Sequence, residues 1–564
     1  MILVAEGIIH INIVQVTRGF MKTLGCIVIL LLACAVPVRA AQVYSGCAVP
    51  SPTPRHVWYI DPVHGKTPAA GGNGSQASPW NSLPGVIAGQ WGLSGFSVPG
   101  YTRPLLSSVP YVHIANGKLV AVADQLGNPP VQPGDALMLM SGNYGDIVIG
   151  DFNLPTTNSD FVTVEAAPGQ TPVFTTLLLN RTNKWVFDAI KVQSLLGTNG
   201  NFQPLVYLTD QGAAFPTTDI ILENMQISSA DSTAGWSQAQ WRAQSRFGVS
   251  EFGSAGNGAN GEPYTNCISV AGSHIQNVHL GAILAANNSL FTNNVIDHFG
   301  DDGIDYAASN LAITHNTLHD NLDMGDGNHE DAMQGQNGPL GAGVVYNAFS
   351  NILIDSNLIA RETVPNNPFP TYLQGIDAFD EDWTNVTVTN NVVITSACHG
   401  ITFTSIHNGL IANNTVLNDG LFPVPGCIAA INVGGASHEG RVSTNTVVRN
   451  NLTSQLNIDT RITGLVPDHN VVLCCGPGPF ISWYVNGVVQ YLSQPGTYMN
   501  GNIIDTEGAK GEFINFNPAT LTYTVLLKSS AQAIGAGVAG APTTDIAGYT
   551  RKAPYAVGAY AYPF

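Results

Sequence analysis

The chain reads NSLFTNNVI from residue 288 to residue 296, and the same pattern returns five more times before residue 454. Each copy has an Asn, an apolar residue three positions later, and a second Asn six positions after the first. A unit this short cannot bury an apolar face alone, so the copies are predicted to stack on one another as a solenoid. The Asn pairs are Asn288/Asn294, Asn310/Asn316, Asn351/Asn357, Asn385/Asn391, Asn408/Asn414 and Asn445/Asn451.

The repeated Asn residues suit the corners of such a solenoid. Asn tolerates the left-handed backbone that a sharp turn between strands requires. Asn side chains stacked at the spacing of neighbouring strands, roughly 4.8 Å, can also bond to one another along a column. We therefore predict that all twelve Asn residues of the repeat are structural.

Composition and charge narrow the class of protein and of partner. Of 564 residues, 44% are hydrophobic and 10% are charged, so the chain has enough apolar surface to fold. The formal net charge of −18 predicts that nucleic acid is not a partner, because its phosphates would be repelled. An acidic polysaccharide would need a cation or a local patch of Arg.

The N-terminal region predicts export. Lys22 precedes an apolar run from Leu24 to Val36, and a cleavage site for a secretory leader lies between Ala40 and Ala41. Residues 1–20 then form an upstream extension. Lipid attachment at Cys34 is an alternative. We expect a secreted or periplasmic protein, with no membrane-spanning segment because the apolar run is too short.

Six Cys residues follow the predicted cleavage site: Cys47, Cys267, Cys398, Cys427, Cys474 and Cys475. An oxidising compartment permits disulfides, but the fifteen complete pairings stay open. The composition along the chain predicts the upstream extension and leader in residues 1–40, a loop-rich N-terminal segment and cap in 41–130, the solenoid in 131–475 and closing strands and loops in 476–564.

The chain resembles the pectate-lyase-like right-handed parallel β-helix superfamily. The resemblance is carried by the Asn repeat and by paired phrases at residues 59–62 with 77–80, 133–135 with 142–144, and 533–537 with 557–560. It implies an all-β fold, a right-handed parallel β-helix with loop insertions on one face. It does not choose a reaction, because the superfamily includes lyases, hydrolases, epimerases and adhesins.

A short strand phrase follows most repeats, and one phrase precedes them. Its third position is always Ile or Met and should face the core, while the small second position and the fourth should face outward. The fourth position predicts an exposed column: Ser269, Asp305, Gln334, Asp377, Thr402 and Ala429. The first position, placed at a corner, predicts a flanking column: Asn266, Asp302, Asp331, Gln374, His399 and Gly426.

Both columns are most polar in the middle coils and fade at their ends, which indicates a site. Three insertions, at residues 321–330, 335–350 and 362–373, interrupt these coils and are predicted to form a binding wall. We therefore expect a glycan to bind in a groove across the coils that hold residues 302–402.

Asp302, Asp305, Asp331 and Asp377 are the candidates for acid, base or nucleophile, and His399 for proton transfer. Stacked carboxylates repel, so at least one should keep a proton near neutral pH. Strand spacing places Asp302 and Asp331 roughly 5 Å apart and Asp305 and Asp377 roughly 9–10 Å apart, near retaining and inverting glycosidase distances respectively. The alternative is that these Asp residues only cap turns.

Neighbouring residues are candidates for binding substrate or metal. His329, Glu330, Gln334, Gln374 and Arg361 could bind a glycan, and Trp383, Tyr372 and Phe369 could stack on its rings. Asp323, Asp326 and Glu330 offer the hard oxygens that calcium prefers, although their spacing is not that of an EF-hand. We therefore expect either no cofactor or Ca²⁺.

A weaker similarity links the chain to polygalacturonases, through Asp301-Asp302 and His399-Gly400. The chain departs from that pattern at Cys398 and at Arg461-Ile462-Thr463, which lacks the Lys of the family. These departures put galacturonan as the substrate in doubt, and no role is carried over.

The sequence favours a secreted, monomeric polysaccharide-degrading enzyme. Hydrolysis is slightly favoured, because carboxylates dominate and no Lys lies between residues 192 and 509. The first alternative is a lyase or C5-epimerase acting on uronic-acid polysaccharide, with calcium assisting. The second is a non-catalytic adhesin, which predicts polar residues spread evenly along the outer face.

Overall fold

The computed structural model describes residues 42–87, 98–101, 103–109, 112–115, 118–121, 129–150, 156–194, 203–209, 215–252, 265–336, 348–421, 427–434, 440–459, 461–474, 479–485 and 488–562. The expected leader, Cys34, Gly426, Cys475 and most of the predicted insertion 335–350 lie outside these residues. All described residues belong to the compact unit 39–564.

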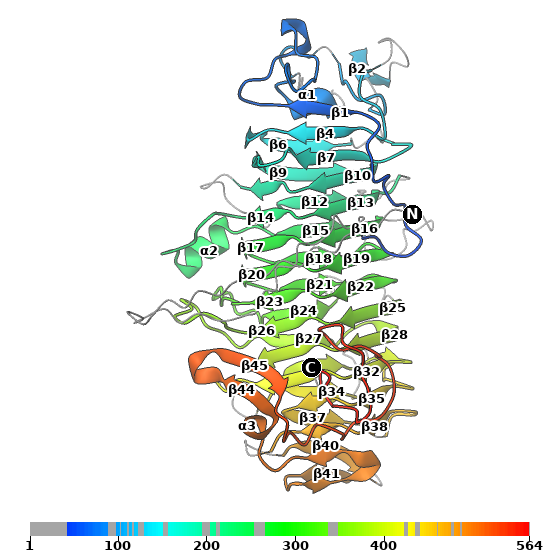
Figure 1. Cartoon of the computed structure of the whole chain (residues 1–564), viewed down its shortest axis with the longest axis vertical. Coiled ribbons are helices and arrows are strands. Elements are labelled where there is room, and N and C mark those ends of the chain that lie inside the picture. Colours follow the sequence, from blue (N-terminus) through cyan, green and yellow to red (C-terminus); the bar gives the residue numbers. More distant parts are fainter. Residues whose placement is uncertain are drawn as a thin grey trace, which may run out of the picture. The chain divides into compact units, whose positions relative to one another are not determined.

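The described chain coils as a parallel β-helix, in which each turn adds one strand to each of three sheets (Figure 1). The first sheet runs in the order β1 (Val57–Ile60), β4 (Ala136–Leu139), β7 (Val162–Ala166), β10 (Asn183–Asp188), β13 (Thr218–Glu223), β16 (Asn266–Ala271), β19 (Ser289–Thr292), β22 (Leu311–Thr314), β25 (Ala348–Asp355), β28 (Asp382–Thr389), β32 (Leu410–Ala412), β35 (Val447–Arg449) and β38 (Val466–Asp468), with β31 (Ile406–His407) beside β28.

The second sheet follows the first in every turn. It contains β5 (Gly142–Asn143), β8 (Pro172–Phe174), β11 (Lys191–Gln193), β14 (Gln226–Ser228), β17 (His274–Val278), β20 (Val295–Phe299), β23 (Thr317–His319), β26 (Leu358–Ala360), β29 (Val392–Thr395), β33 (Thr415–Asn418), β36 (Leu452–Thr453), β39 (Val471–Val472), β43 (Ile503–Ile504) and β42 (Gly496–Thr497).

The third sheet completes each turn. It contains β6 (Asp146–Ile149), β9 (Thr176–Asn180), β12 (Val206–Thr209), β15 (Val249–Phe252), β18 (Ala282–Leu284), β21 (Ile304–Tyr306), β24 (Asp331–Gly335), β27 (Gln374–Ala378), β30 (His399–Phe403), β34 (Ala430–Val433), β37 (Gln455–Ile458), β40 (Ile481–Val485) and β41 (Val488–Leu492). Parallel pairing thus starts at β1, before residue 131, and reaches β43.

The remaining elements are short. They are the helices α1 (Leu83–Ile87), α2 (Gln238–Gln244) and α3 (Ala509–Glu512), the 3-10 turns Pro68–Ala70, Met499–Gly501 and Pro518–Thr520, and the hairpins β2 (Val112–Ala115)/β3 (Lys118–Ala121) and β44 (Phe513–Asn517)/β45 (Thr522–Leu527). No helix in the described ranges is long and apolar enough to cross a membrane.

A buried ladder of Asn side chains runs along the corner between the first and second sheets. Each Nδ2 donates to the Oδ1 of the next Asn, in the order Asn294, Asn316, Asn357, Asn391, Asn414, Asn451, Asn470 and Asn502. The predicted column is confirmed and extends two rungs further. The ladder is structural because it satisfies backbone and side-chain polar groups inside a buried corner.

The left-handed residues differ between the two Asn columns. The first Asn of each pair has a positive φ, between 49° and 61°. At the corner between the first and second sheets, which holds the buried ladder, the residue before the ladder Asn takes that conformation instead. Asn413, for example, has a φ of 57°. A polar side chain at the position before the ladder Asn can stay exposed to solvent or contact a segment that covers the corner.

Two disulfides join segments that the sequence left unassigned. Cys47 pairs with Cys267 and Cys398 pairs with Cys427. The first bridge holds the N-terminal segment against the first sheet, where Val43 and Ala48 pack on Phe161 and its neighbours.

The C-terminal segment covers the outer face of the second sheet. Ala533, Val557 and Ala559 are fully buried in a cluster that includes Leu417 and Leu452 of the coils. Residues 476–564 therefore include the last strands of the coil and a further segment that packs along the solenoid. This segment, which contains Ala533, Val557 and Ala559, is called the C-terminal strap.

Candidate active site

Four of the predicted strand phrases lie in register in the third sheet. The pairs Ile304↔Met333, Met333↔Ile376 and Ile376↔Ile401 align their core positions. The fourth positions therefore stack as Asp305, Gln334, Asp377 and Thr402, and the first positions as Asp302, Asp331, Gln374 and His399. The alignment of the central part of both predicted columns is confirmed. The predicted exposure of the fourth positions is wrong, because Gln334, Asp377 and Thr402 are buried.

The ends of the columns were predicted wrongly. Asn266 and Ser269 belong to β16 of the first sheet, and the third-sheet neighbour of Asp305 on that side is Ile283 of β18. At the other end Thr402 pairs with Asn432 instead of Ala429, beside an irregularity between His399 and Ile401.

Polarity continues toward the C-terminal coils instead of fading. Asn432 Nδ2 donates to Thr402 Oγ1 at 2.8 Å, and Asn457 Nδ2 donates to Asn432 Oδ1 at 2.7 Å. The sequence comparison missed Asn432 and Asn457 because the loop before β34 shifts the phrase by three residues. The third sheet thus carries an amide ladder that continues from the acidic coils.

The small second positions do not form the floor of a groove. A Cβ on Gly303 would lie 2.6 Å from both Ala332 O and Leu318 Cδ2, and one on Gly375 would lie 2.0 Å from Gly400 O. This position is small because it meets the next coil and the core at a tight corner. The prediction that it faces outward was wrong.

Asp302 and Asp305 form a hydrogen-bonded pair of carboxyl groups. Burial raises the pKa of Asp302 well above its usual range, with the charges of Asp305, Asp331 and Asp301 adding to the effect. Asp302 also accepts the backbone N–H of Asp331 at 2.8 Å. Burial raises the pKa of Asp305 to about 7, although the hydrogen bond from Asp302 lowers it in part. We place a proton on Asp302, which donates it toward Asp305.

Asp331 and Asp377 form a second pair on adjacent coils. Burial raises the pKa of Asp377 well above its usual range, followed by the charge of Asp331 and a hydrogen bond to it. Neither oxygen of Asp377 accepts a hydrogen bond from another described group. Asp377 is therefore the protonated partner, and its proton points to Asp331.

Asp331 is the hub of the site. His329 Nδ1 lies 2.9 Å from Asp331 Oδ2, and Gln334 Nε2 donates to the same oxygen at 3.0 Å. The hydrogen bond to Asp331 raises the pKa of His329, whose side chain is 50% exposed. A buried carboxylate thus orients an imidazole that faces solvent.

The accessible groups around this hub are few. Asp305 and His399 are partly exposed, whereas Asp302, Asp331 and Asp377 are buried. Burial lowers the pKa of His399, and its Nδ1 lies 3.1 Å from Thr402 Oγ1. His399 is therefore a neutral imidazole at the same surface as His329, two coils further along.

Asp301 is a further member that sequence analysis considered only through the polygalacturonase pattern. Its pKa is raised to about 6, mainly by burial. Asn328 donates a hydrogen bond to Asp301, and His279 Nε2 lies 3.9 Å from it. Its position directly before Asp302 is the signal that could have identified it.

Several predicted substrate-binding residues are not accessible. Glu330, Gln334 and Gln374 are buried, and Glu330 accepts a hydrogen bond from Thr371 Oγ1 at 2.8 Å. Burial raises the pKa of Glu330 to about 7. These side chains support the site from below and do not face a ligand.

Arg361 and Trp383 lie away from the site, which corrects two predictions. Arg361 is buried and paired with Asp419 at 2.8 Å and with Glu362 at 3.0 Å. Trp383 is fully buried in the core, where its ring packs on Tyr306 and Phe349. The spacing of Arg361 from its repeat Asn did not reveal that its side chain is buried against Asp419, and Trp383 belongs to the first sheet.

Of the other aromatics, Phe369 packs on Trp241 and Met324 in a small side cluster beside α2. Tyr372 stays partly exposed, and burial together with the charges of Glu330 and Asp331 raises its pKa. Tyr372 is therefore the one predicted ring that remains near the acidic hub.

The predicted calcium ligands do not converge. Asp326 lies on the surface and caps a turn through Asn328 N at 3.1 Å, while Asp323 caps the neighbouring turn at Gly325 N. Within the described ranges, no three His, Cys, Asp or Glu side chains come close enough to hold a metal ion. Calcium stays a prediction that this arrangement does not support.

The match to a family model agrees with the fold described above. Residues 254–453 match the family model described as right handed beta helix region. Pectate lyase Pel9A is 11% identical, with 90% of this chain and 97% of that chain covered and a TM-score of 0.36. The Azotobacter vinelandii mannuronan C-5 epimerase AlgE6 A-module is 15% identical, with 64% and 91% covered and a TM-score of 0.36.

PfbA, a surface adhesin of Streptococcus pneumoniae, is 9% identical, with 67% of this chain and 87% of that chain covered and a TM-score of 0.39. No curated protein matches the chain. The described chain is thus a parallel β-helix, its residues 254–453 match the model of a right handed beta helix region, and its chemistry has to be argued from its own residues.

Proposed function

We propose that this right-handed β-helix acts on a polysaccharide that contains uronic acids, and that it removes the hydrogen at C5 of the sugar. This is the first step of a polysaccharide lyase or a C5-epimerase. The observation that carries the proposal is the half-exposed imidazole of His329, bound through Nδ1 to buried Asp331. If Nδ1 donates to Asp331, Nε2 keeps its lone pair and faces the substrate side.

The proton balance of an elimination fits the groups present. His329 Nε2 takes the C5 proton, and the electron pair of the former C5–H bond forms the new C4=C5 double bond. The C4–O bond breaks at the same time, and its electron pair leaves with the oxygen. The leaving oxygen then needs a proton. Asp305, with a pKa of about 7 and partial exposure, can supply it near neutral pH.

Protonated carboxyls reduce the repulsion that an acidic glycan would meet. Asp302 and Asp377 both hold protons in the arrangement described above, so the local negative charge is smaller than the number of Asp residues indicates. The repulsion of an acidic glycan, expected from the net charge of −18, is therefore weaker at these coils than the net charge indicates. Calcium bridging the substrate remains a separate proposal.

Hydrolysis is less well supported than the sequence indicated. A glycosidase needs two carboxyl groups that reach opposite sides of one bond. Here Asp302, Asp331 and Asp377 are buried, and the four predicted residues bond to one another in pairs. Hydrolysis stays the second candidate because Asp301 and Asp305 are both partly exposed and have raised pKa values, of about 6 and about 7 respectively.

Export is proposed along with this function. Two disulfides in the described chain suit an oxidising compartment, in line with the predicted leader. The expectations drawn from the sequence, that the protein is a monomer and binds a polysaccharide, are kept here as proposals.

The test is an assay on pectate and alginate polymers, followed by absorbance of unsaturated uronide and by reducing ends. His329→Gln should lower the rate by a factor of roughly 100 or more, the range typical of general-base loss. His64→Gln is the control, because His64 is 82% exposed and lies outside the site. A full rate for His329→Gln, or reducing ends without unsaturated product, would contradict the proposal.

A further inference from the structure

His399 ends a series of hydrogen bonds that the proposed reaction leaves unused. Asn432 Nδ2 donates one hydrogen to Thr402 Oγ1 at 2.8 Å and the other to the backbone carbonyl of Cys398 at 3.1 Å. Thr402 Oγ1 in turn lies 3.1 Å from His399 Nδ1. These contacts lie on the third sheet, on the C-terminal side of the coil that holds Asp331.

Each group in this series has one orientation that satisfies its neighbours. The carbonyl of Cys398 can only accept, so it faces the amide nitrogen of Asn432, and Asn457 Nδ2 donates to the amide oxygen at 2.7 Å. The same amide nitrogen donates to Thr402 Oγ1, in a side chain that is 3% exposed. The hydroxyl hydrogen of Thr402 therefore goes to His399 Nδ1, because a buried hydroxyl hydrogen without an acceptor is costly.

The series fixes the tautomer of His399. A neutral imidazole that accepts at Nδ1 carries its hydrogen on Nε2. Burial lowers the pKa of His399, which favours the neutral ring, and the edge-on contact with Phe379 at 4.8 Å holds that ring in place. His329 has the opposite arrangement when its Nδ1 donates to Asp331, because its Nε2 then keeps a lone pair. The site thus presents one imidazole acceptor and one imidazole donor.

A ligand can reach the Nε2 atom of His399. The residue is partly exposed, and its Nε2 is not sealed from solvent and makes no hydrogen bond to another described residue. His399 lies two coils from Asp331 in the column of first positions, and the charges of Asp331 and His329 both act on it. One sugar residue can therefore contact both imidazoles.

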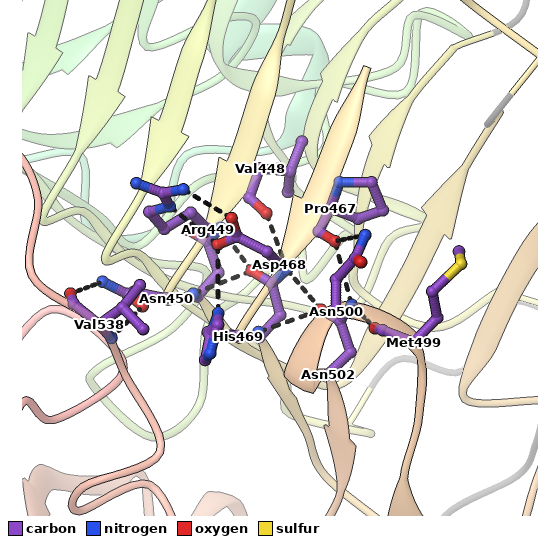
Figure 2. A network of polar contacts seen from close by, with 12 residues as sticks. Val448, Arg449, Asn450, Pro467, Asp468, His469, Met499, Asn500, Asn502 and Val538 are labelled. Atoms are coloured by element: carbon purple, nitrogen blue, oxygen red, sulfur yellow. Dashed lines mark hydrogen bonds and ion pairs between the residues drawn. The ribbon is translucent and has the colours of Figure 1, made fainter. Parts of the chain in front are cut away.

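A ladder of amides alone does not make a site in this protein. The buried ladder at the corner between the first and second sheets ends at Asn502, whose Nδ2 donates to Met499 O at 2.7 Å and to Pro467 O at 3.2 Å (Figure 2). That ladder is satisfied by the coils themselves. The series on the third sheet ends instead in a partly exposed imidazole, so its last donor is left for a ligand.

We propose that His399 Nε2–H binds the C6 carboxylate of the uronic acid whose C5 hydrogen His329 removes. This inference rests on the proposed function and adds the residue that selects a free carboxylate. As the C5–H bond breaks, its proton moves to His329 Nε2 and its electron pair is shared with the carboxylate, where a fixed donor stabilises the added charge. His399 keeps its hydrogen throughout. Thr402 and Asn432 are positioning residues, because they act through His399.

The test is calorimetric titration of the full chain carrying His329→Gln, so that turnover does not consume the ligand. The ligands are trimers of D-galacturonate and of D-mannuronate, each compared with its methyl ester, in EDTA so that no metal ion bridges them to the protein. At least one acid trimer should bind about tenfold or more tightly than its ester, as expected for a hydrogen bond to a charged group. His399→Leu and Thr402→Val, each added to His329→Gln, should remove this preference.

Thr402→Ser is the matched control, because it keeps the hydroxyl and should keep the preference for the acid. Equal binding of acid and ester, no binding of any trimer, or a preference that survives in either His399→Leu or Thr402→Val would overturn the proposal. Removal of the C5 hydrogen by a protein without this preference would reject only the role of His399. New reducing ends with the C5 hydrogen intact, together with a preference that requires His399, would reject only the proposed reaction.

Discussion

At the scale of single residues, the site works by dividing protons among carboxyl groups of one type. Asp302 and Asp377 are buried and protonated, whereas Asp331 accepts from His329, Gln334 and Asp377. Burial is the largest cause of each raised pKa, and the neighbouring carboxylate is a further cause. Asp302 and Asp377 thus act as proton donors and Asp331 as an acceptor, although all three are the same residue type, because their surroundings differ.

The pH dependence of the rate follows from two groups. The raised pKa of His329 means that it binds a proton and loses its base function as the pH falls. Asp305 must hold its proton to act as acid, so the rate should also fall above pH about 7. A bell-shaped profile of kcat/KM against pH is expected.

The alkaline limb of that profile tests the role of Asp305. Asp305→Asn should lower the rate roughly 100-fold or more, and the remaining activity should show no fall above pH about 7. Asp326→Asn, which removes an exposed carboxylate in the adjoining loop, should leave the profile in place. An alkaline limb that persists in Asp305→Asn would assign the acid to another group.

At the scale of elements, the corners of the coil decide the fold. The side chain of Asn391 makes four hydrogen bonds: it accepts from Asn357 N and Nδ2 and donates to Ile354 O and Asn414 Oδ1. All four lie in a buried corner. Repetition of this arrangement at every rung keeps successive strands in register and so stacks the columns of the third sheet.

Removing one rung of the ladder should therefore be costly. Asn391→Ala is expected to lower the free energy of unfolding by about 2–5 kcal/mol, because the partners of a buried amide stay unpaired. Chemical denaturation measures the change. Asn515→Ala, at an exposed position in β44, should change stability by less than about 0.5 kcal/mol. Equal stability of the two variants would show that the ladder contributes little.

The same elements explain what could be predicted from the sequence. The Asn spacing repeats because the corner repeats, so the coil and the alignment of Asp305, Gln334, Asp377 and Thr402 follow from it. Loops of unequal length break that relation, and Asn432 replaced Ala429 for this reason. Side-chain direction was also out of reach, since Arg361 is buried against Asp419 although its position in the repeat allowed either side.

At the scale of the folded unit 39–564, long-range ties secure the two ends of the described chain to the coils. The Cys47–Cys267 bridge closes a separation of 220 residues, and the C-terminal strap buries Ala533, Val557 and Ala559 on the second sheet. These ties cover apolar surface that the coil alone would expose.

Loss of the N-terminal tie should be measurable. Cys47→Ser is expected to lower the stability by about 2–4 kcal/mol, because a bridge over a long loop restricts the unfolded chain. Thermal unfolding under non-reducing conditions measures this. Identical unfolding of the variant and the parent chain would mean that packing of Val43 and Ala48 holds the segment without the bridge.

The most direct measurement is the fate of the hydrogen at C5 when the protein acts on a polyuronate in deuterated water, followed by proton NMR. The proposed chemistry predicts either an olefinic H4 signal from unsaturated ends or deuterium at C5 of inverted residues. Both require His329, so the His329→Gln variant should give neither. New reducing ends with the C5 hydrogen intact would contradict the account and assign the acidic coils to hydrolysis.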